Sequence, residues 1–171
     1  MENRQYAKLV MRMSEYDHGS PKRIQHLLKV HAFSRTIGIL EGLDEGSLYI
    51  LETAALVHDI GIRPALEKYG SEAGYLQEKE GPEEAEKLLK DIGGYTEEQM
   101  ERICYLVGHH HTYKDMDGMD YRILVEADFL VNLYENNVKY KAILASDENI
   151  FRTEAGRTIL KTMFEEENKD K

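Results

Sequence analysis

The sequence contains almost no cysteine, since Cys104 is the only one in 171 residues. One cysteine excludes an internal disulfide and a cysteine-rich zinc site, and it is typical of a reducing compartment. No apolar run approaches the roughly 20 residues of a membrane-spanning helix. The charged stretch from Met1 to Val10 is also unlike the apolar core of a signal peptide. These absences predict a cytoplasmic protein that does not enter a membrane.

Positive charge is scarce as well. Lysine and arginine number 22 against 32 aspartates and glutamates, which gives a formal net charge of −10. A surface of that sign repels DNA and RNA, so we expect no nucleic-acid partner, although a local basic pocket for a small anion remains possible. The length favours one domain, residues 1–171.

Alternating strand patterns are few, and the apolar spacing is mostly helical. Each of the three prolines (Pro21, Pro64 and Pro82) stands where a helix could begin. Ser20 reads as an N-cap, Thr96 to Gln99 as a capping box, and Gly93-Gly94 as a helix end. Helices are predicted over residues 21–40, 48–58, 82–92, 121–134 and 149–164, and a further helix opens at the capping box and carries Met100, Ile103, Leu106, Val107 and the histidines that follow. We expect residues 60–81 and 111–120 to be the least regular, and the acidic tail 165–171 to be frayed surface. The sequence therefore predicts an all-α protein.

Histidines and buried aspartates form the most informative pattern. Six of the seven histidines fall in three predicted helices: His26, His31, His58, His109, His110 and His111. A single histidine on an apolar face is usually a hydrogen-bonded core residue. Asp59 and Asp128, however, lie on strongly apolar helices, where a carboxylate is costly unless its charge is offset. A divalent metal ion does that, and nitrogen and oxygen ligands suit Mn, Fe, Co, Ni, Zn or Mg.

Three blocks in order make the chain recognisable. Arg23 to Val30 matches R-x-x-H-x-x-x-V, Leu56 to Gly61 matches L-x-H-D-I-G, and Ala127 to Leu130 matches A-D-x-L. The sequence thus resembles the HD-domain superfamily of metal-dependent phosphohydrolases. The resemblance implies a single-domain helical bundle with a core at about residues 20–135 and a C-terminal helical extension at 136–164. It also implies that one metal ion is held by four residues: His26, His58, Asp59 and Asp128. Periodicity alone leaves His26 and His31 equivalent, and the resemblance selects His26.

Some HD proteins bind a second metal ion through a histidine before a proline and a downstream His-His pair. The setting of His110 and His111 is similar to that of the pair, but Gly81-Pro82 stands where the family often has His-Pro. We therefore expect one tightly bound ion. His110 and His111 would then contact the substrate phosphate, together with Arg23, which lies nearly one helical turn before His26.

The resulting hypothesis is a metal-dependent phosphohydrolase that acts on a small phosphate ester, such as a nucleotide, through metal-activated water. Asp59 and His110 are the expected catalytic residues, and Arg23, His110 and His111 the expected substrate-binding residues. An alternative is a non-hydrolytic HD-like module that senses a nucleotide or a metal. A two-iron oxygenase of HD type would need a more complete second site. The oligomeric state and the identity of the metal stay open.

Overall fold

The computed structural model describes residues 3–164, and in that part of the chain it contains helices and no strand. The prediction of an all-α fold is confirmed. The predicted frayed tail, residues 165–171, lies outside the described residues. The elements in order are α1 (Asn3–Tyr16), α2 (Pro21–Leu40), α3 (Glu45–Val57), the short 3-10 helix η1 (His58–Gly61), α4 (Ile62–Tyr69), α5 (Gly74–Ile92), α6 (Glu97–Val107), α7 (Met119–Glu135), α8 (Tyr140–Asn149) and α9 (Glu154–Phe164).

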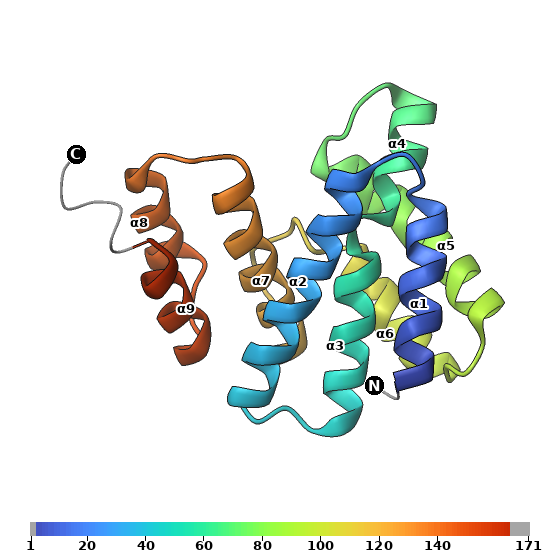
Figure 1. Ribbon diagram of the computed structural model, residues 1–171, viewed down its shortest axis with the longest axis horizontal. Helices are drawn as coiled ribbons and strands as arrows, with labels where there is room; N and C mark the ends of the chain where they lie inside the picture. Colours follow the sequence, from blue (N-terminus) through green and yellow to red (C-terminus); the bar gives the residue numbers. More distant parts are fainter. Residues whose placement is uncertain (1–2, 165–171) are drawn as a thin grey trace.

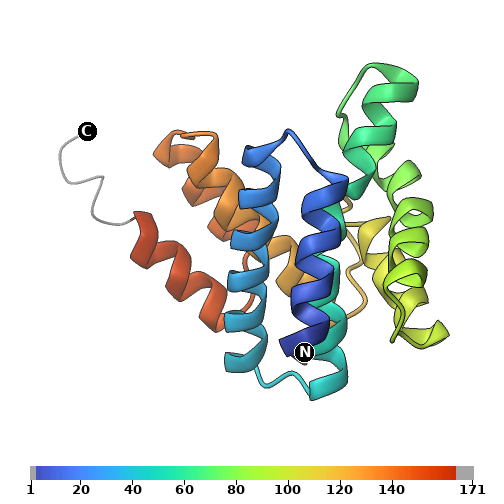
Figure 2. The ribbon, with the colours of Figure 1, turned by 45° about the vertical axis from the view of Figure 1, so that its right-hand side comes forward.

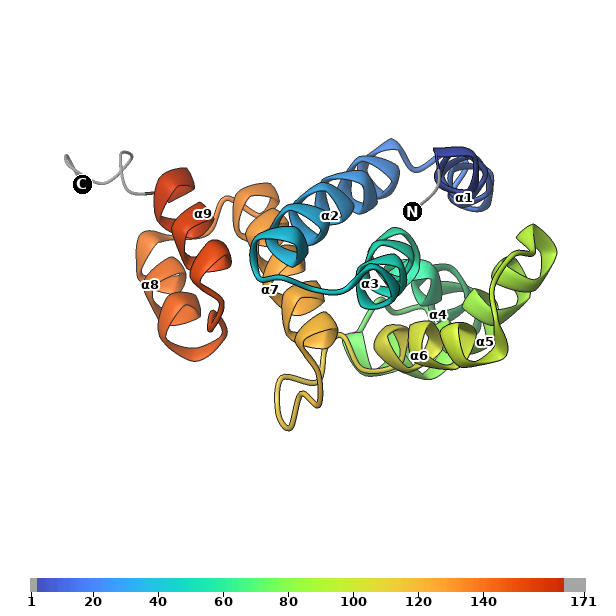
Figure 3. The same cartoon turned by 90° about the horizontal axis from the view of Figure 1, so that it is seen from below.

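Helix α3 lies at the centre of the molecule. Its residues from Leu51 to Val57 are all buried, which agrees with a sequence that is apolar nearly all round. It packs against α2 on one side and α6 on the other, as Figure 3 shows, and also against α7. Helix α2 and helix α7 lie side by side along their length (Figure 1). The C-terminal end of α3 therefore lies between α2, α7 and the α5–α6 pair.

Most helix boundaries follow from local capping chemistry. The Asp44 carboxylate accepts hydrogen bonds from the backbone N–H groups of Gly46 and Ser47 at the start of α3. The predicted capping box of α6 is present, since Thr96 and Gln99 each bond the other's backbone. Helix α5 ends at Gly93, whose positive φ of 71° suits glycine. Ser20 takes the N-cap position of α2, but its side chain makes no capping hydrogen bond, and Pro21 starts the helix.

The prediction that residues 60–81 are irregular is wrong. These residues form η1, α4 and the first half of α5, and Pro82 lies inside α5 instead of starting a helix. A proline inside a helix removes one hydrogen bond, so tertiary packing must hold the helix together here. That packing is close: a Cβ on Gly61 would lie 2.3 Å from the backbone oxygen of Gln77. The absence of side chains at Gly61 and Gly81 lets η1 and α5 meet backbone to backbone.

The C-terminal helices α8 and α9 lie beyond α7, on the side away from α4, α5 and α6 (Figures 1 and 2). The helix predicted at 149–164 begins later than expected, because Asn149 is the last residue of the separate helix α8 and α9 begins only at Glu154. Helix α9 packs against α7 and α2. Over residues 3–164, none of the helices combines the length and the apolar character that a bilayer span requires.

Candidate metal centre

Three elements bring the four predicted metal ligands together. His26 comes from α2, His58 and Asp59 from η1, and Asp128 from α7. The His26 Nε2 lies 3.0 Å from Asp128 Oδ1 and 3.6 Å from Asp59 Oδ2. The His58 Nε2 lies 3.5 Å and 3.7 Å from the same two oxygens. Two imidazole nitrogens and two carboxylates thus converge on one point at the end of α3.

The orientation of the rings favours a metal. His58 donates its Nδ1 proton to the Ala55 carbonyl oxygen at 3.0 Å, and His110 donates to the Val107 carbonyl oxygen at 2.8 Å. In both rings the lone pair is then on Nε2, the atom that faces the carboxylates. Both side chains have no exposed surface, yet neither Nε2 has a hydrogen-bond partner. Buried acceptors without a donor are costly, and a metal ion held between Asp59 and Asp128 would satisfy the Nε2 of His58.

A second group adjoins the first through Asp59. The Asp59 Oδ2 faces His26 and His58, whereas its Oδ1 lies 3.5 Å from the His110 Nε2. One ligand atom each from Asp59, His110 and His111 lie within 4.8 Å of one another. The Asp59 carboxylate therefore stands between two clusters, as a carboxylate that bridges two ions does.

The centre contains ionised side chains although it is largely buried. Burial raises the pKa of Asp128, but the hydrogen bond from His26 and the positive charges that His58 and His26 carry when protonated outweigh this effect and hold that pKa well below its usual range. Burial likewise raises the pKa of Asp59, and the charges of His58 and His110 more than reverse it. For His26, burial lowers the pKa, whereas Asp128 and Asp59 raise it, to about 9. Two carboxylates that stay ionised in a buried site are a strong attraction for a cation.

A cavity of about 320 Å³ opens onto this centre from solvent. It is lined by Ser20, Lys22, Arg23, His26, Asp59, Ile62, Glu72, Gln77, His111, Asp128, Asn132 and Glu135. Of the predicted substrate-binding residues, Arg23 and His111 therefore reach the cavity wall. His110 is fully buried behind Asp59 and is absent from that wall. The Arg23 guanidinium is held by Asp17 at 2.9 Å and lies 3.9 Å from Glu72.

Comparison with known proteins agrees with this geometry. The family model described as the HD domain matches residues 23–148. The chain belongs to the HD-domain family. A crystal structure of a predicted HD superfamily hydrolase from an uncultured Thermotogales bacterium has a similar fold, with a TM-score of 0.66 and 24% sequence identity. The match covers 93% of this chain and 84% of that one. No curated protein matches the chain.

Two residues beside the HD centre were missed by the sequence analysis although they carry a signal. Asn132 and Glu135 follow Asp128 on α7 at helical spacing, so all three share one face. The Asn132 amide donates to Asp128 Oδ1 at 2.8 Å, and Glu135 accepts from the His26 Nδ1 at 3.2 Å. Outer hydrogen bonds of this kind orient metal ligands. The spacing of four and seven residues from Asp128 could have found both.

The α5 residue that borders the HD centre is not the residue at the family's His-Pro position. Gly81 does not line the cavity, and a Cβ there would lie 2.7 Å from Val107 Cγ1. The α5 residue that does line it is Gln77, one turn earlier. Its Oε1 lies 3.2 Å from the His111 Nε2. No sequence signal marked Gln77, because the helix that carries it was not predicted to extend so far.

His31 lies away from the HD centre, on another face of α2. Its Nε2 is 3.4 Å from Glu52 Oε1, and its ring centroid is 4.9 Å from that of Tyr6. The Glu52 carboxylate is also paired with Arg35 at 2.6 Å. This buried acid and its partners join α1, α2 and α3 and do not reach the cavity.

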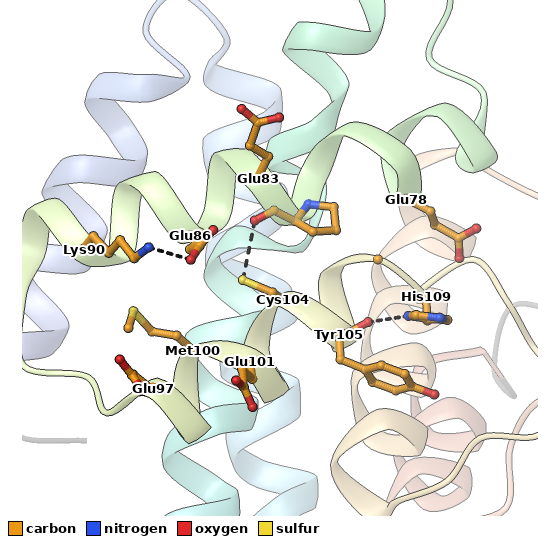
Figure 4. A pocket seen from close by; sticks show the side chains of 12 residues that line it. Glu78, Glu83, Glu86, Lys90, Glu97, Met100, Glu101, Cys104, Tyr105 and His109 are labelled. Carbon is orange, nitrogen blue, oxygen red and sulfur yellow. Dashed lines mark hydrogen bonds and ion pairs between the residues drawn. The ribbon is translucent and has the colours of Figure 1, made fainter.

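A larger cavity, about 880 Å³, lies between α5 and α6 (Figure 4). Glutamates dominate its wall, and Lys90 is paired there with Glu86 at 2.6 Å. Cys104 is also on the wall, and burial raises the pKa of its thiol to about 11, so the thiol stays protonated and unreactive. The wall contains none of the four predicted metal ligands, and its negative charge opposes a phosphate. The smaller cavity is therefore the candidate functional site.

Proposed function

We propose that this HD-family protein is a metal-dependent phosphohydrolase that acts on a small phosphate ester, with nucleotides as the first class to test. Membership of the HD family supports the coarser description, a metal-dependent hydrolase. One observation carries the proposal most directly. The buried Nε2 atom of His58 has no hydrogen-bond partner and faces the carboxylates of Asp59 and Asp128, which is the arrangement that a divalent ion completes.

The proposed metal ligands provide both nitrogen and oxygen donor atoms. His26, His58, Asp59 and Asp128 would hold the ion, and such a set suits Mn, Fe, Co, Ni, Zn or, with added waters, Mg. When bound, a divalent ion lowers the pKa of water and offsets charge on a phosphoryl group. Asp59 accepts a hydrogen bond from the attacking water and orients it. His110, which the sequence suggested for the phosphate, is fully buried at the Oδ1 side of Asp59 and does not line the cavity, so we do not assign it a contact with the substrate.

The cavity wall suits a small anion. Its volume, about 320 Å³, is near the lower end for ligand sites, which are typically about 300–1,000 Å³. Lys22 and Arg23 bring positive charge to its mouth, and Asp17 holds the Arg23 guanidinium in a fixed orientation. His111 completes the wall. Lys22 and Arg23 would bind the phosphate of the substrate close to Asp59, and the ordinary screening length of about 8 Å limits repulsion from the rest of the acidic surface.

The second candidate is a module that binds a nucleotide or a metal ion without turnover. The same cavity and cations would serve it. Against it stands the convergence of four ligands beside an open cavity, because a purely structural metal site is normally closed to solvent.

The test compares the wild-type protein with Asp128→Asn, and uses Asp120→Asn as a matched control. Asp120 is another buried aspartate of α7, but it pairs with Arg102 outside the centre. We expect phosphate release from p-nitrophenyl phosphate or a nucleotide panel that EDTA abolishes and added metal restores. Asp128→Asn should lose bound metal and at least about 100-fold in rate, whereas Asp120→Asn should keep both. If calorimetry shows tight nucleotide binding but no phosphate is released, the phosphohydrolase is rejected in favour of the sensing module.

A further inference from the structure

The second cluster, around Asp59 Oδ1, is bordered by the first two turns of α5. The His111 side chain packs closely against Gly74, where a Cβ would come within 2.8 Å of two ring atoms. The His111 backbone N–H donates to Glu78 Oε1 at 3.0 Å, and the Thr112 hydroxyl donates to the same oxygen. These contacts fix the backbone and one face of His111, so its ring cannot swing freely.

Gln77 then determines which ring nitrogen carries the proton. The Gln77 amide nitrogen donates to the Glu72 carbonyl oxygen at 2.7 Å, and its amide oxygen lies 3.2 Å from the His111 Nε2. A backbone carbonyl only accepts, so the amide nitrogen must face Glu72 and the amide oxygen must face His111. An amide oxygen also only accepts. The His111 Nε2 must therefore be the donor, and it carries the proton of the neutral ring.

This tautomer is the opposite of the one in His58 and His110. Those two rings give their Nδ1 protons to backbone carbonyls and keep a lone pair on Nε2. In His111 the lone pair is on Nδ1, which lies 3.5 Å from the Tyr113 hydroxyl. A protonated ring nitrogen has no lone pair to give a metal, so Nε2 is excluded as a ligand, and the remaining nitrogen, Nδ1, is next to the Tyr113 hydroxyl.

We propose that Gln77 is a positioning residue that holds His111 as the Nε2–H tautomer, keeps the ring out of the coordination shell, and so limits the centre to one tightly bound ion. The inference rests on the proposed metal centre and concerns how many ions it holds. When His111 is not a ligand, the second cluster provides two ligand atoms, Asp59 Oδ1 and the His110 Nε2. Two protein ligands, one of them shared, hold a second ion far more weakly than four hold the first. His111 serves instead as a fixed wall of the cavity.

The test reads the ring nitrogens directly. Protein labelled with ¹⁵N on histidine and loaded with Zn²⁺ is dialysed, and long-range ¹H–¹⁵N spectra and elemental analysis are recorded. In the wild type we expect a protonated Nε2 and an unprotonated, uncoordinated Nδ1 for His111, with one ion per chain. Gln77→Leu removes the acceptor, so the His111 tautomer should shift away from Nε2–H and the Kd of a second Zn²⁺ should fall at least tenfold.

Gln5→Leu is the matched control, because Gln5 also bonds a backbone carbonyl, that of Gly93, but lies outside the centre. It should leave the His111 signals and the ion count unchanged. A metal-coordinated His111 nitrogen or two retained ions in the wild type would overturn the inference, as would a Gln77→Leu protein with the wild-type tautomer. None of these readouts uses turnover. An inactive protein with one bound ion and the expected His111 tautomer would refute the phosphohydrolase and leave the role of Gln77 standing.

Discussion

His26 and His31 show how strongly the surroundings decide what a residue does. They are five residues apart on α2, and both are buried. The His26 ring lies between Asp128 on one side and Glu135 on the other, with Asp59 also within reach. The His31 ring lies between Tyr6 and Glu52. Identical side chains on one helix thus belong to the candidate metal centre and to a packing interface, because each faces a different neighbouring helix.

This pair gives a matched test at the residue scale. His26→Ala should reduce bound metal to well under one ion per chain and leave the helical circular dichroism in place, since it removes one of four ligands. His31→Ala should keep the metal but lower the free energy of unfolding by about 1–3 kcal/mol, because it empties a buried site beside Glu52. Metal content by elemental analysis and denaturant unfolding check the two outcomes. Metal loss that followed His31 instead of His26 would contradict the ligand assignment.

At the scale of elements, the contact between η1 and α5 positions three residues of the candidate centre. Helix α5 carries Gln77 to the cavity, and η1 carries His58 and Asp59. The two elements can approach only because Gly61 and Gly81 lack side chains at their contact. The glycine at the end of the L-x-H-D-I-G block therefore has a packing role. It lets a helix backbone lie directly against the short turn that holds the His-Asp pair.

Gly61→Ala should consequently be costly. Its Cβ would lie 2.3 Å from the Gln77 oxygen and 2.9 Å from the Gly81 nitrogen, both backbone atoms that cannot rotate away. We expect a loss of about 1–3 kcal/mol of stability, typical of overpacking, together with weaker metal binding because η1 must shift. Gly46→Ala is the control: this exposed glycine is in the first turn of α3, where its Cβ would meet only the Asp44 side chain. Thermal unfolding and metal titration measure both, and a Gly61→Ala protein as stable as the control would refute the packing role.

At the scale of the whole molecule, a buried carboxylate joins the C-terminal helices to the rest of the fold. Glu126 of α7 has no exposed surface and accepts hydrogen bonds from the backbone N–H groups of Arg152 and Thr153 and from the Thr153 hydroxyl. The Ala155 N–H donates to Glu41, at the end of α2, at 2.8 Å. The start of α9 is thus held by acids of two other elements, as the positive end of a helix dipole favours.

Removing the Glu126 carboxylate should weaken the attachment of α9 to the rest of the fold and leave the candidate metal centre unchanged. Glu126→Ala leaves buried donors unpaired, so we expect a loss of about 2–4 kcal/mol and faster amide hydrogen exchange in α9. Metal content should be unchanged, because Glu126 lies outside the centre even though Asp128 is two residues away. Glu101→Ala, at an exposed glutamate of α6, serves as the control. Exchange in α9 that stayed at the wild-type rate would show that Glu126 does not anchor the helix.

Much of this protein follows from its sequence alone. The periodicity of α2, α3, α6 and α7 and the caps at Thr96 and Gly93 are local properties, so they could be recognised before any packing was known. The order of the three HD blocks indicated the family, and the HD-domain match over residues 23–148 confirms it. The four proposed ligands were named from the sequence, and the structure brings them together. Their role as ligands stays a prediction.

Other features depended on tertiary structure. Pro82 lies inside α5 because the contacts of η1 and α6 outweigh its local preference to begin a helix, and this extension carries Gln77 to the cavity. His110 is buried behind Asp59 and His111 lines the wall, although the two are adjacent in sequence. Local patterns record which face of a helix is apolar. They do not record which neighbour covers that face, and the side chain of that neighbour decides which nitrogen of a histidine is free.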